Sequence, residues 1–497
     1  MAVYLGIDVG TTAVKAALFA ADGAVVGSAT VEYVLSQPAP DAVELDAEVY
    51  WSSCCTAVRR ALAAAGIDPQ SVRALAVSSQ AETIIPVDGD GRPARPALVW
   101  LDNRPAAEAA LIEAEFGAPA AFRITGQPQV APTWPACKIL WLKRNDPQAY
   151  RAARRFLLVE DFVLHRLTGG YWTERSLQSS SLMLDINSGQ WWPEMLAYLD
   201  ITPAQLGELA NSGDVVGALR PEAAAALGLP PGVTVVAGTL DQVAAAVGAG
   251  NVGPGVVSET TGGVLGLVAT VKHPVFDPKA RVPCHVHALP GAYCLLPWGQ
   301  TAGMALRWFR DEIWAGAGEP GGYEEITAAA AEVPPGAEGL LALPHLEGAA
   351  CPEFNPHAKG VFFGVTLRHG RAHFARAILE SVAYLLRGNL ELLAELGAPA
   401  VELLSMGGGA RSDLWLQIKA DVTGLPVTEA GGDEASCRGA AMLAAVATGE
   451  FEDLRQAADA MAYRGRQFLP RPENRAVYDD GFLRYGELYR RLEPMFR

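Results

Sequence analysis

Residues 3–28 read VYLGIDVGTTAVKAALFAADGAVVGS, and this stretch decides the fold class. Its apolar runs predict three strands, over residues 3–9, 14–19 and 24–28. The Asp22-Gly23 pair between the last two runs is a strong hairpin signal. The chain is therefore expected to open with an antiparallel meander rather than with a strand–helix–strand unit.

Further along the chain, helical and strand patterns alternate. Asp46 can cap a helix that runs to Ala65 and ends at Gly66. Residues 74–78 and 233–237 read as strands, and residues 240–247 read as a helix that follows the second of them. Alternation of this kind predicts an α/β fold.

A glycine-rich junction at residues 248–255 precedes a second copy of the opening theme. Residues 255–268 read GVVSETTGGVLGLV, which is an apolar strand, a Thr-Gly turn and another apolar strand. This repeat predicts a duplicated architecture with domains of residues 1–250 and 251–497. The second domain is expected to hold a long helix over residues 372–396, a strand over 401–405, a helix over 414–423 and a helical, charged tail from residue 454.

Composition excludes several classes of protein. The chain has 497 residues, and 39 Lys and Arg against 55 Asp and Glu give a net charge of −16. A net acidic surface repels nucleic-acid phosphates, so no nucleic-acid partner is expected. No apolar run is long enough to span a bilayer, so no membrane association is expected. Seven cysteines without a Cys-x-x-Cys pair indicate reduced thiols and a cytoplasmic location.

The first candidate site lies between the first two predicted strands, in the sequence Asp8-Val9-Gly10-Thr11-Thr12-Ala13-Val14-Lys15. Backbone N–H groups and threonine hydroxyls in such a bend can hold phosphate oxygens. Asp8 can bind Mg²⁺ directly or through water, and Lys15 can neutralise phosphate charge. An ordinary hairpin with a surface lysine is the alternative explanation of the same residues.

Three further motifs carry groups of the same kind. Ser258-Glu259-Thr260-Thr261-Gly262-Gly263 offers hydroxyls at a second flexible bend. Met406-Gly407-Gly408-Gly409-Ala410-Arg411-Ser412-Asp413 joins a strand to a helix through small residues, against which a flat ring can lie. Gly238-Thr239-Leu240-Asp241-Gln242 places a carboxylate after a strand, where an N-cap is the alternative role.

Taken together and in this order, these motifs resemble the FGGY family of carbohydrate kinases over nearly the whole chain. The resemblance implies two ribonuclease-H-like α/β domains of the actin/hexokinase type around a deep cleft. It also implies ATP-dependent phosphorylation of a hydroxyl of a small sugar or polyol, with ATP and Mg²⁺ as cofactors. A ketopentose such as xylulose is the first expectation for the substrate, and a glycerol- or erythritol-type polyol is the second.

The resemblance implies roles for individual residues. Asp241 is the expected catalytic base, and Asp8 is the expected Mg²⁺ ligand. The expected ATP-binding residues are Thr11, Thr12, Lys15, Thr261, Gly262, Gly303, Gly408, Gly409 and Asp413. The expected substrate-binding residues are Ala81, Glu82, Trp134, Asp241 and Gln242.

The segment expected to bind the sugar departs from the family patterns. It reads Ser79-Gln80-Ala81-Glu82-Thr83, where xylulokinases resemble Met-His-Gly and glycerol kinases resemble Arg-Glu-Thr. Glu82-Thr83 fits the second pattern, while Ala81 removes its cation and leaves extra room. Glu82 can accept two hydrogen bonds from the hydroxyls of a ketose or polyol.

Proteins of other classes share the implied fold. Actin- and chaperone-type ATPases and a catalytically inactive sugar sensor are the alternatives. Asp241-Gln242 and the sugar segment favour a kinase over the ATPases, and the presence of both Asp8 and Asp241 favours an enzyme over a sensor. A small-molecule substrate is the expected partner, and a homodimer is the expected assembly if the chain self-associates.

Overall fold

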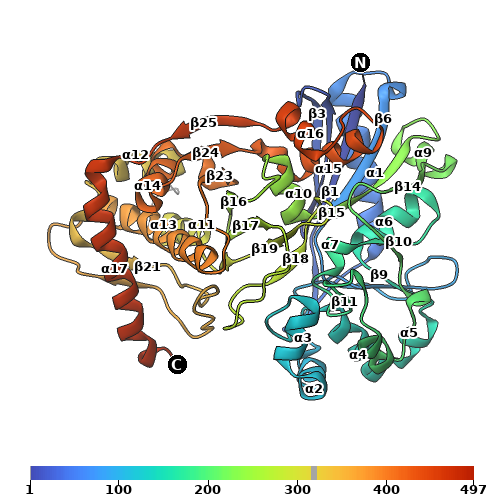
Figure 1. The fold of residues 1–497 in the computed structure, drawn as a ribbon, viewed down its shortest axis with the longest axis horizontal. Coiled ribbons are helices and arrows are strands. Elements are labelled where there is room, and N and C mark those ends of the chain that lie inside the picture. The colour runs from blue at the N-terminus through green and yellow to red at the C-terminus, as the bar shows by residue number, and fades with distance from the viewer. Residues whose placement is uncertain (1, 315–321) are drawn as a thin grey trace. The chain divides into compact units, whose positions relative to one another are not determined.

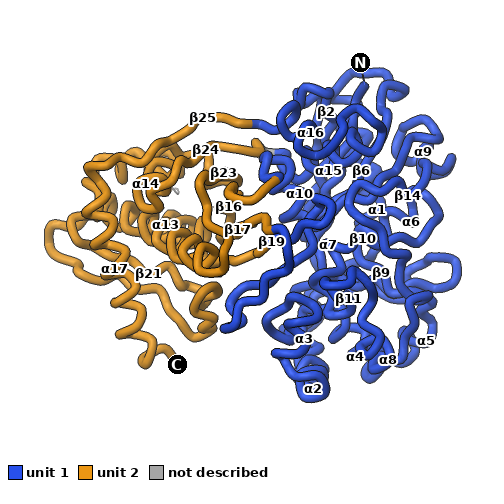
Figure 2. Tube along the Cα trace, viewed as in Figure 1, with its two compact units in different colours: residues 1–252, 272–294, 434–463 blue, residues 253–271, 295–433, 464–497 orange. Residues whose placement is uncertain are grey.

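The computed structural model describes residues 2–314 and 322–497, which form two compact units. Unit 1 comprises the chain up to residue 252 together with residues 272–294 and 434–463, and unit 2 comprises the other described residues (Figure 2). The chain first crosses from unit 1 to unit 2 two residues after the boundary predicted at residue 250. Two later segments then return to unit 1, which a single boundary does not describe.

A six-stranded sheet forms the centre of unit 1 (Figure 1). The predicted meander is confirmed, because β1 (Val3–Val9) pairs antiparallel with β2 (Ala13–Ala20), which pairs antiparallel with β3 (Val25–Glu32). On the other side of β1, β6 (Val72–Ser79) and then β15 (Thr234–Leu240) run parallel to it. β14 (Val215–Ala218) completes the sheet next to β15.

Helices cover both faces of this sheet. Helix α1 (Ala47–Ala65) begins at Asp46, whose side chain accepts a hydrogen bond from the Glu48 N–H, and it ends at left-handed Gly66. Leu5 and Ile7 of β1 share a core with the apolar side of α1. Successive strand residues point to opposite faces of a sheet. Gly6, between Leu5 and Ile7, therefore points to the other face, where it meets Cys437 of α15 (Ala435–Ala447).

The helix that carries Asp241 is held by a close contact between two backbones. α10 (Asp241–Gly248) packs on α15, and both contribute a glycine to the crossing. A Cβ on Gly248 would lie 2.0 Å from the Ala435 carbonyl oxygen, and one on Gly439 would lie 2.0 Å from the Ala244 carbonyl oxygen. Only glycine at both positions permits this approach, which holds α10 close against α15.

Unit 2 repeats the local topology of unit 1, as the duplicated motif predicts. β16 (Val256–Thr261) pairs antiparallel with β17 (Leu265–Val271) and parallel with β23 (Glu402–Met406), as β1 does with β2 and β6. The sheet continues through β24 (Val427–Ala430) to β25 (Arg464–Phe468), and β20 (Trp298–Gly299) pairs with β17. Helices α13 (Arg371–Glu395) and α14 (Asp413–Thr423) confirm the two helices predicted there.

The C-terminal region differs from its prediction. Helices α16 (Leu454–Met461) and α17 (Arg475–Leu492) are present, but β25 lies between them and pairs antiparallel with β24. The sequence of β25, Arg-Gly-Arg-Gln-Phe, lacks the alternation of apolar and polar residues that indicates a strand. This agrees with its exposure over most of its length. Among the described residues, no helix combines the length and the apolar character that crossing a membrane requires.

The glycine contact between α10 and α15 can be tested by adding one methyl group. Gly439→Ala is expected to lower the free energy of unfolding by about 1–3 kcal/mol, because an added methyl group overpacks a tight contact. Denaturant unfolding measures the change. Gly388→Ala in α13 is the matched control, since a Cβ there meets nothing within 4 Å and alanine favours the helix. Equal stabilities of the two variants would contradict the proposed contact.

Candidate active site

The carboxyl ends of neighbouring parallel strands in unit 1 bring two acidic residues to one edge of the sheet. Asp8 lies near the end of β1, and its Oδ1 accepts a hydrogen bond from Ser78 Oγ of β6 at 3.1 Å. Asp241 follows directly after β15, on the other side of β6. Lys15 lies opposite Asp8 in the β1–β2 register. Asp8 and Lys15, predicted to act together, are therefore neighbours.

The carboxyl group of Asp241 is the more strongly perturbed of the two. Burial and the negative charges of Asp8 and Glu82 raise the pKa of Asp241 to about 8, although the Gln242 N–H donates to its Oδ1 at 2.6 Å. The pKa of Asp8 rises to about 6, chiefly because of burial. Asp241 remains partly accessible to solvent. The Asp241 carboxylate therefore has an increased affinity for protons, and a ligand can reach it.

Asp241 is not the N-cap of its helix, which was the alternative role considered from the sequence. The N-cap position belongs to Leu240, and Asp241 is the first residue of α10. Its carboxylate accepts from the adjacent N–H of Gln242, whose own side chain is exposed. The helix start therefore orients the Asp241 carboxylate but leaves it available for another partner.

The predicted sugar segment forms a tight turn directly after β6. The Gln80 N–H donates to the Val9 carbonyl oxygen, and the Thr83 N–H donates to the Ala81 carbonyl oxygen at 2.8 Å. Between Ala81 and Thr83, Glu82 has a φ of +63°, a conformation that is costly for a residue with a Cβ. Ala81 itself is buried.

A lysine that sequence reasoning did not assign to the site supports this turn. Lys138 of α4 (Pro135–Asn145) is fully buried, and its Nζ donates to the Glu82 carbonyl oxygen at 2.9 Å. Burial lowers the pKa of Lys138 and raises the pKa of Glu82, while each charge favours the ionised form of the other. Trp134 is the N-cap of the same helix, and its indole N–H donates to the Gln129 carbonyl oxygen.

The hydroxyl of Thr11 is already engaged within unit 1. Thr11 Oγ1 accepts a hydrogen bond from Trp100 Nε1 at 2.9 Å and donates to Gln80 Oε1 at 3.3 Å. Thr12 is exposed in the same bend. Trp100, to which the sequence analysis gave no site role, also donates its backbone N–H to Thr83 Oγ1 at 3.1 Å, so it joins the phosphate bend to the sugar turn.

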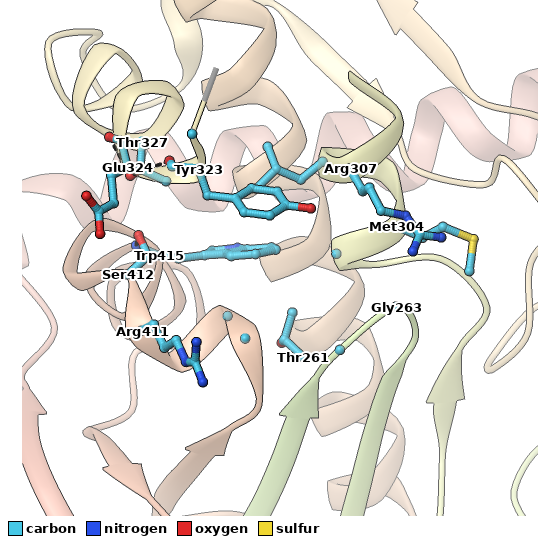
Figure 3. Close-up of a pocket in the computed structure, with 16 residues that line it drawn as sticks. Thr261, Gly263, Met304, Arg307, Tyr323, Glu324, Thr327, Arg411, Ser412 and Trp415 are labelled. Carbon is cyan, nitrogen blue, oxygen red and sulfur yellow. Dashed lines mark hydrogen bonds between the residues drawn. The ribbon is translucent and has the colours of Figure 1, made fainter. Parts of the chain in front are cut away.

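Unit 2 contains a cavity of about 600 Å³ beside the second phosphate motif. Its lining brings together most of the residues predicted there and adds an aromatic pair. In Figure 3 the ring of Tyr323 lies over the indole of Trp415, with Arg411 and Ser412 on one side and Thr261 on the other. The lining residues are Thr261, Gly262, Gly263, Gly303, Met304, Leu306, Arg307, Gly322, Tyr323, Glu324, Thr327, Gly408, Gly409, Arg411, Ser412 and Trp415.

Glycines give this cavity its shape. A Cβ on Gly303 would lie 2.3 Å from the Gly262 carbonyl oxygen, which accepts a hydrogen bond from the Gly303 N–H. A Cβ on Gly409 would lie 2.7 Å from the Thr261 side chain, whereas one on Gly408 would meet nothing within 4 Å. The turn and the strand–helix loop therefore pack tightly together, and Gly408 borders open space in which a flat ring can lie.

A buried ion pair supports the same turn. Lys419 Nζ of α14 lies 2.5 Å from Glu259 Oε1 of β16, and both side chains are fully buried. The lysine also donates to Thr261 Oγ1 at 2.9 Å and to Ser405 Oγ at 3.1 Å. Thr261 Oγ1 in turn donates to Glu259 Oε2 at 2.8 Å. The Thr261 hydroxyl is thus held inside unit 2.

Of the ATP-binding residues predicted in unit 2, one, Asp413, lies outside the cavity lining. Asp413 begins α14, but its carboxylate pairs with Arg466 of β25, which also pairs with Glu429. The neighbouring residues Arg411 and Ser412 line the cavity instead. This arginine lies on β25, a strand that the sequence analysis did not predict, and it forms an ion pair with the Asp413 carboxylate.

The donor groups fit a nucleotide and a magnesium ion. Mg²⁺ is bound through one or two carboxylates together with substrate phosphates rather than by a cage of protein ligands. Asp8 offers such a carboxylate, and among residues 2–314 and 322–497 no cluster of three or more His, Cys, Asp or Glu could hold a metal alone. The cavity in unit 2 has the volume and the aromatic and glycine lining that suit a nucleoside.

Two α/β units of repeated topology, with acidic residues at a sheet edge in one and a glycine-lined cavity in the other, are the arrangement expected of an actin/hexokinase-type phosphotransferase. Family models for the N-terminal and C-terminal domains of the FGGY family of carbohydrate kinases match residues 3–248 and 261–448. The chain belongs to this family, and the predicted fold class is confirmed.

Individual relatives agree with this assignment. The chain is 33% identical over 500 residues to a xylulose kinase of Escherichia coli, with 99% of each chain covered. It is 33% identical over 473 residues to a glycerol kinase of Trichlorobacter lovleyi, with 92% of each covered. The crystal structure of a xylulose kinase from Rhodospirillum rubrum superposes with a TM-score of 0.91, at 30% identity and 99% coverage of both chains.

The buried ion pair of unit 2 leads to a stability prediction. Lys419→Met is expected to lower the free energy of unfolding by about 3–5 kcal/mol, because it leaves the Glu259 carboxylate buried without its cation. Replacing both partners, in Lys419→Leu with Glu259→Leu, is expected to restore most of that loss. Denaturant unfolding of both variants tests the claim, and a double variant as unstable as Lys419→Met would contradict it.

Proposed function

We propose that this carbohydrate kinase transfers the γ-phosphoryl group of ATP to a hydroxyl of a small neutral ketose or polyol, with a ketopentose such as xylulose as the first candidate. The grouping of Asp8, Glu82 and Asp241 in unit 1 carries the proposal. Because burial and the charges of Asp8 and Glu82 raise the pKa of Asp241, Asp241 is the carboxylate best suited to accept a proton. A catalytically inactive sugar sensor would need neither the grouping of three acidic residues nor a carboxylate with a raised pKa.

Asp241 acts as the general base in this proposal. A hydroxyl that attacks the γ-phosphorus must lose a proton, and a carboxylate within hydrogen-bond reach can accept it. The pKa of Asp241, about 8, lies near the ordinary working pH of enzymes, which favours proton transfer. The Gln242 N–H holds one carboxylate oxygen, so the other is free to face the sugar hydroxyl.

The cavity of unit 2 is the proposed ATP site. The adenine ring would lie between Tyr323 and Trp415 and against Gly408, while the turn at Gly262 and Gly263 would hold phosphates through its backbone. The bend at Thr11, Thr12 and Lys15 would contact the phosphates from unit 1. Mg²⁺ held at Asp8 would neutralise charge on the transferring phosphoryl group. The proposal requires the sugar held by unit 1 to meet this ATP during turnover.

Charge in unit 1 favours a neutral substrate over a sugar acid. Asp8, Glu82 and Asp241 are all acidic, and the cation nearest to Glu82, Lys138, is buried behind the turn. A carboxylate on the substrate would be repelled, whereas hydroxyl groups can donate to these oxygens. The relatives named xylulose kinase and glycerol kinase both match the chain at 33% identity, so a polyol is the second candidate.

The proposed setting of the enzyme follows from its charge and thiols. All seven cysteines are free, and six of them are buried, which suits a reducing compartment such as the cytoplasm. The net charge of −16 favours small-molecule substrates over nucleic acid. We include a homodimer in the proposal, and sedimentation velocity of the purified chain tests it.

Asp241→Asn tests the proposed base. The amide cannot accept the proton, so kcat with the best sugar is expected to fall by ~10²–10⁴-fold, the usual contribution of a positioned base. A coupled assay of ADP release measures kcat, and calorimetry with ADP checks that the nucleotide site is intact. A folded Asp241→Asn protein with near-normal turnover would remove Asp241 from this role.

A substrate comparison tests the preference for neutral sugars. A hexonate is expected to show a kcat/KM at least ~100-fold below that of the best ketopentose, since placing like charges together costs several kcal/mol. The Glu82→Gln variant removes one of the three acidic groups. It is expected to reduce the difference in kcat/KM between the ketopentose and the hexonate. A hexonate that is phosphorylated as well as any ketose would contradict the charge argument.

A further inference from the structure

Glu82 occupies a backbone conformation that its own side chain disfavours. Its φ of +63° lies in the left-handed region, and it is neither a glycine nor an asparagine. Such residues persist only where the surrounding structure holds them, and they occur preferentially at functional sites. The turn between Ala81 and Thr83 therefore needs a support outside its own hydrogen bond.

Lys138 is the group placed to give that support. Its side chain has no exposed surface, and its Nζ reaches the Glu82 carbonyl oxygen at 2.9 Å. A backbone carbonyl that accepts from a buried ammonium group is difficult to rotate, because another orientation would leave the charge without its partner. The hydrogen bond thus holds the carbonyl group of the strained residue in place.

The same ammonium group also acts on the Glu82 side chain. Burial raises the pKa of the Glu82 carboxyl group, whereas hydrogen bonding with Ser180 and then the charge of Lys138 lower it. The carboxylate is partly accessible to solvent, whereas Lys138 is enclosed. The lysine cannot reach a substrate itself, but its contact with the Glu82 carbonyl oxygen holds the residue in place and its charge favours the ionised form of Glu82.

Helix geometry fixes the position of Lys138. It lies one turn after Trp134, and its N–H donates to the Trp134 carbonyl oxygen in the first turn of α4. Asp102, which is fully buried and accepts from the Val43 N–H and from Arg104, adds a second negative charge that favours the lysine cation. The ammonium group therefore has little freedom to move away from the turn.

We infer that Lys138 is a positioning residue that holds Glu82 in its strained turn, so that the Glu82 carboxylate can accept hydroxyl groups of the sugar. This inference rests on the proposed function, since it assigns Glu82 to the substrate. It explains why a fully buried lysine lies behind a loop that carries a glutamate. It also makes sugar recognition depend on a residue that never touches the sugar.

A double-mutant cycle with Lys138→Met and Glu82→Ala tests this inference. If Lys138 acts through Glu82, Lys138→Met lowers kcat/KM for the sugar by ~10-fold or more in the wild-type background. In the Glu82→Ala background the same change should lower it by less than ~2-fold, because coupled residues are not additive. KM for ATP should stay within ~2-fold throughout.

Controls separate this result from general damage and from failure of the proposed function. Lys143→Met, on the same helix and partly exposed, removes the same charge and should leave kcat/KM unchanged. Equal losses from Lys138→Met in both backgrounds would overturn the inference and make Lys138 merely structural. If Lys138→Met does not fold, Lys138→Gln, which keeps an N–H donor, replaces it in the same cycle. A wild-type protein that phosphorylates no neutral sugar would overturn the proposed function instead.

Discussion

Burial of the Asp241 carboxylate beside two other acidic groups, at the edge of the unit 1 sheet, is the constraint on which the proposed chemistry depends. Asp8 ends β1, Glu82 follows β6, and Asp241 follows β15, so the strand order places all three at neighbouring strand ends. Burial raises the pKa of Asp241 most, and the charges of Asp8 and Glu82 raise it further. The sheet therefore produces a base by burying a carboxylate beside like charges.

Much of the remaining structure of unit 1 keeps these groups in place. The glycine contact between α10 and α15 holds the helix that carries Asp241 against its neighbour. Ser78 orients Asp8, and buried Lys138 supports the turn that carries Glu82. In unit 2 the Lys419–Glu259 pair has a comparable role, since it holds Thr261 beside the glycine-lined cavity. Each site is thus supported by a buried lysine from a neighbouring helix.

Features with a local signal could be predicted from the sequence. The Asp22-Gly23 turn, the cap at Asp46 and the left-handed Gly66 each depend on a few adjacent residues, and the structure confirms the elements that they delimit. The positions of Asp8 near the end of one strand and of Asp241 directly after another follow in the same way. Contacts between residues far apart in the sequence have no local pattern from which they could be predicted. Lys419 and Glu259 are 160 positions apart, and Lys138 and Glu82 are 56 positions apart. The exposed strand β25 lacks the apolar alternation from which a strand is predicted. Its Arg466 pairs with Asp413, so this ion pair could not be predicted either.

The pH dependence of kcat/KM for the sugar tests the central claim most directly, because it reports the pKa of the base in the free enzyme. Asp241 must be deprotonated to act, so activity is expected to rise with pH through its raised pKa. Glu82→Gln removes one repelling charge and should therefore move this acidic limb to lower pH, whatever it does to the maximal rate. A limb that stays in place or moves to higher pH in Glu82→Gln would contradict the account.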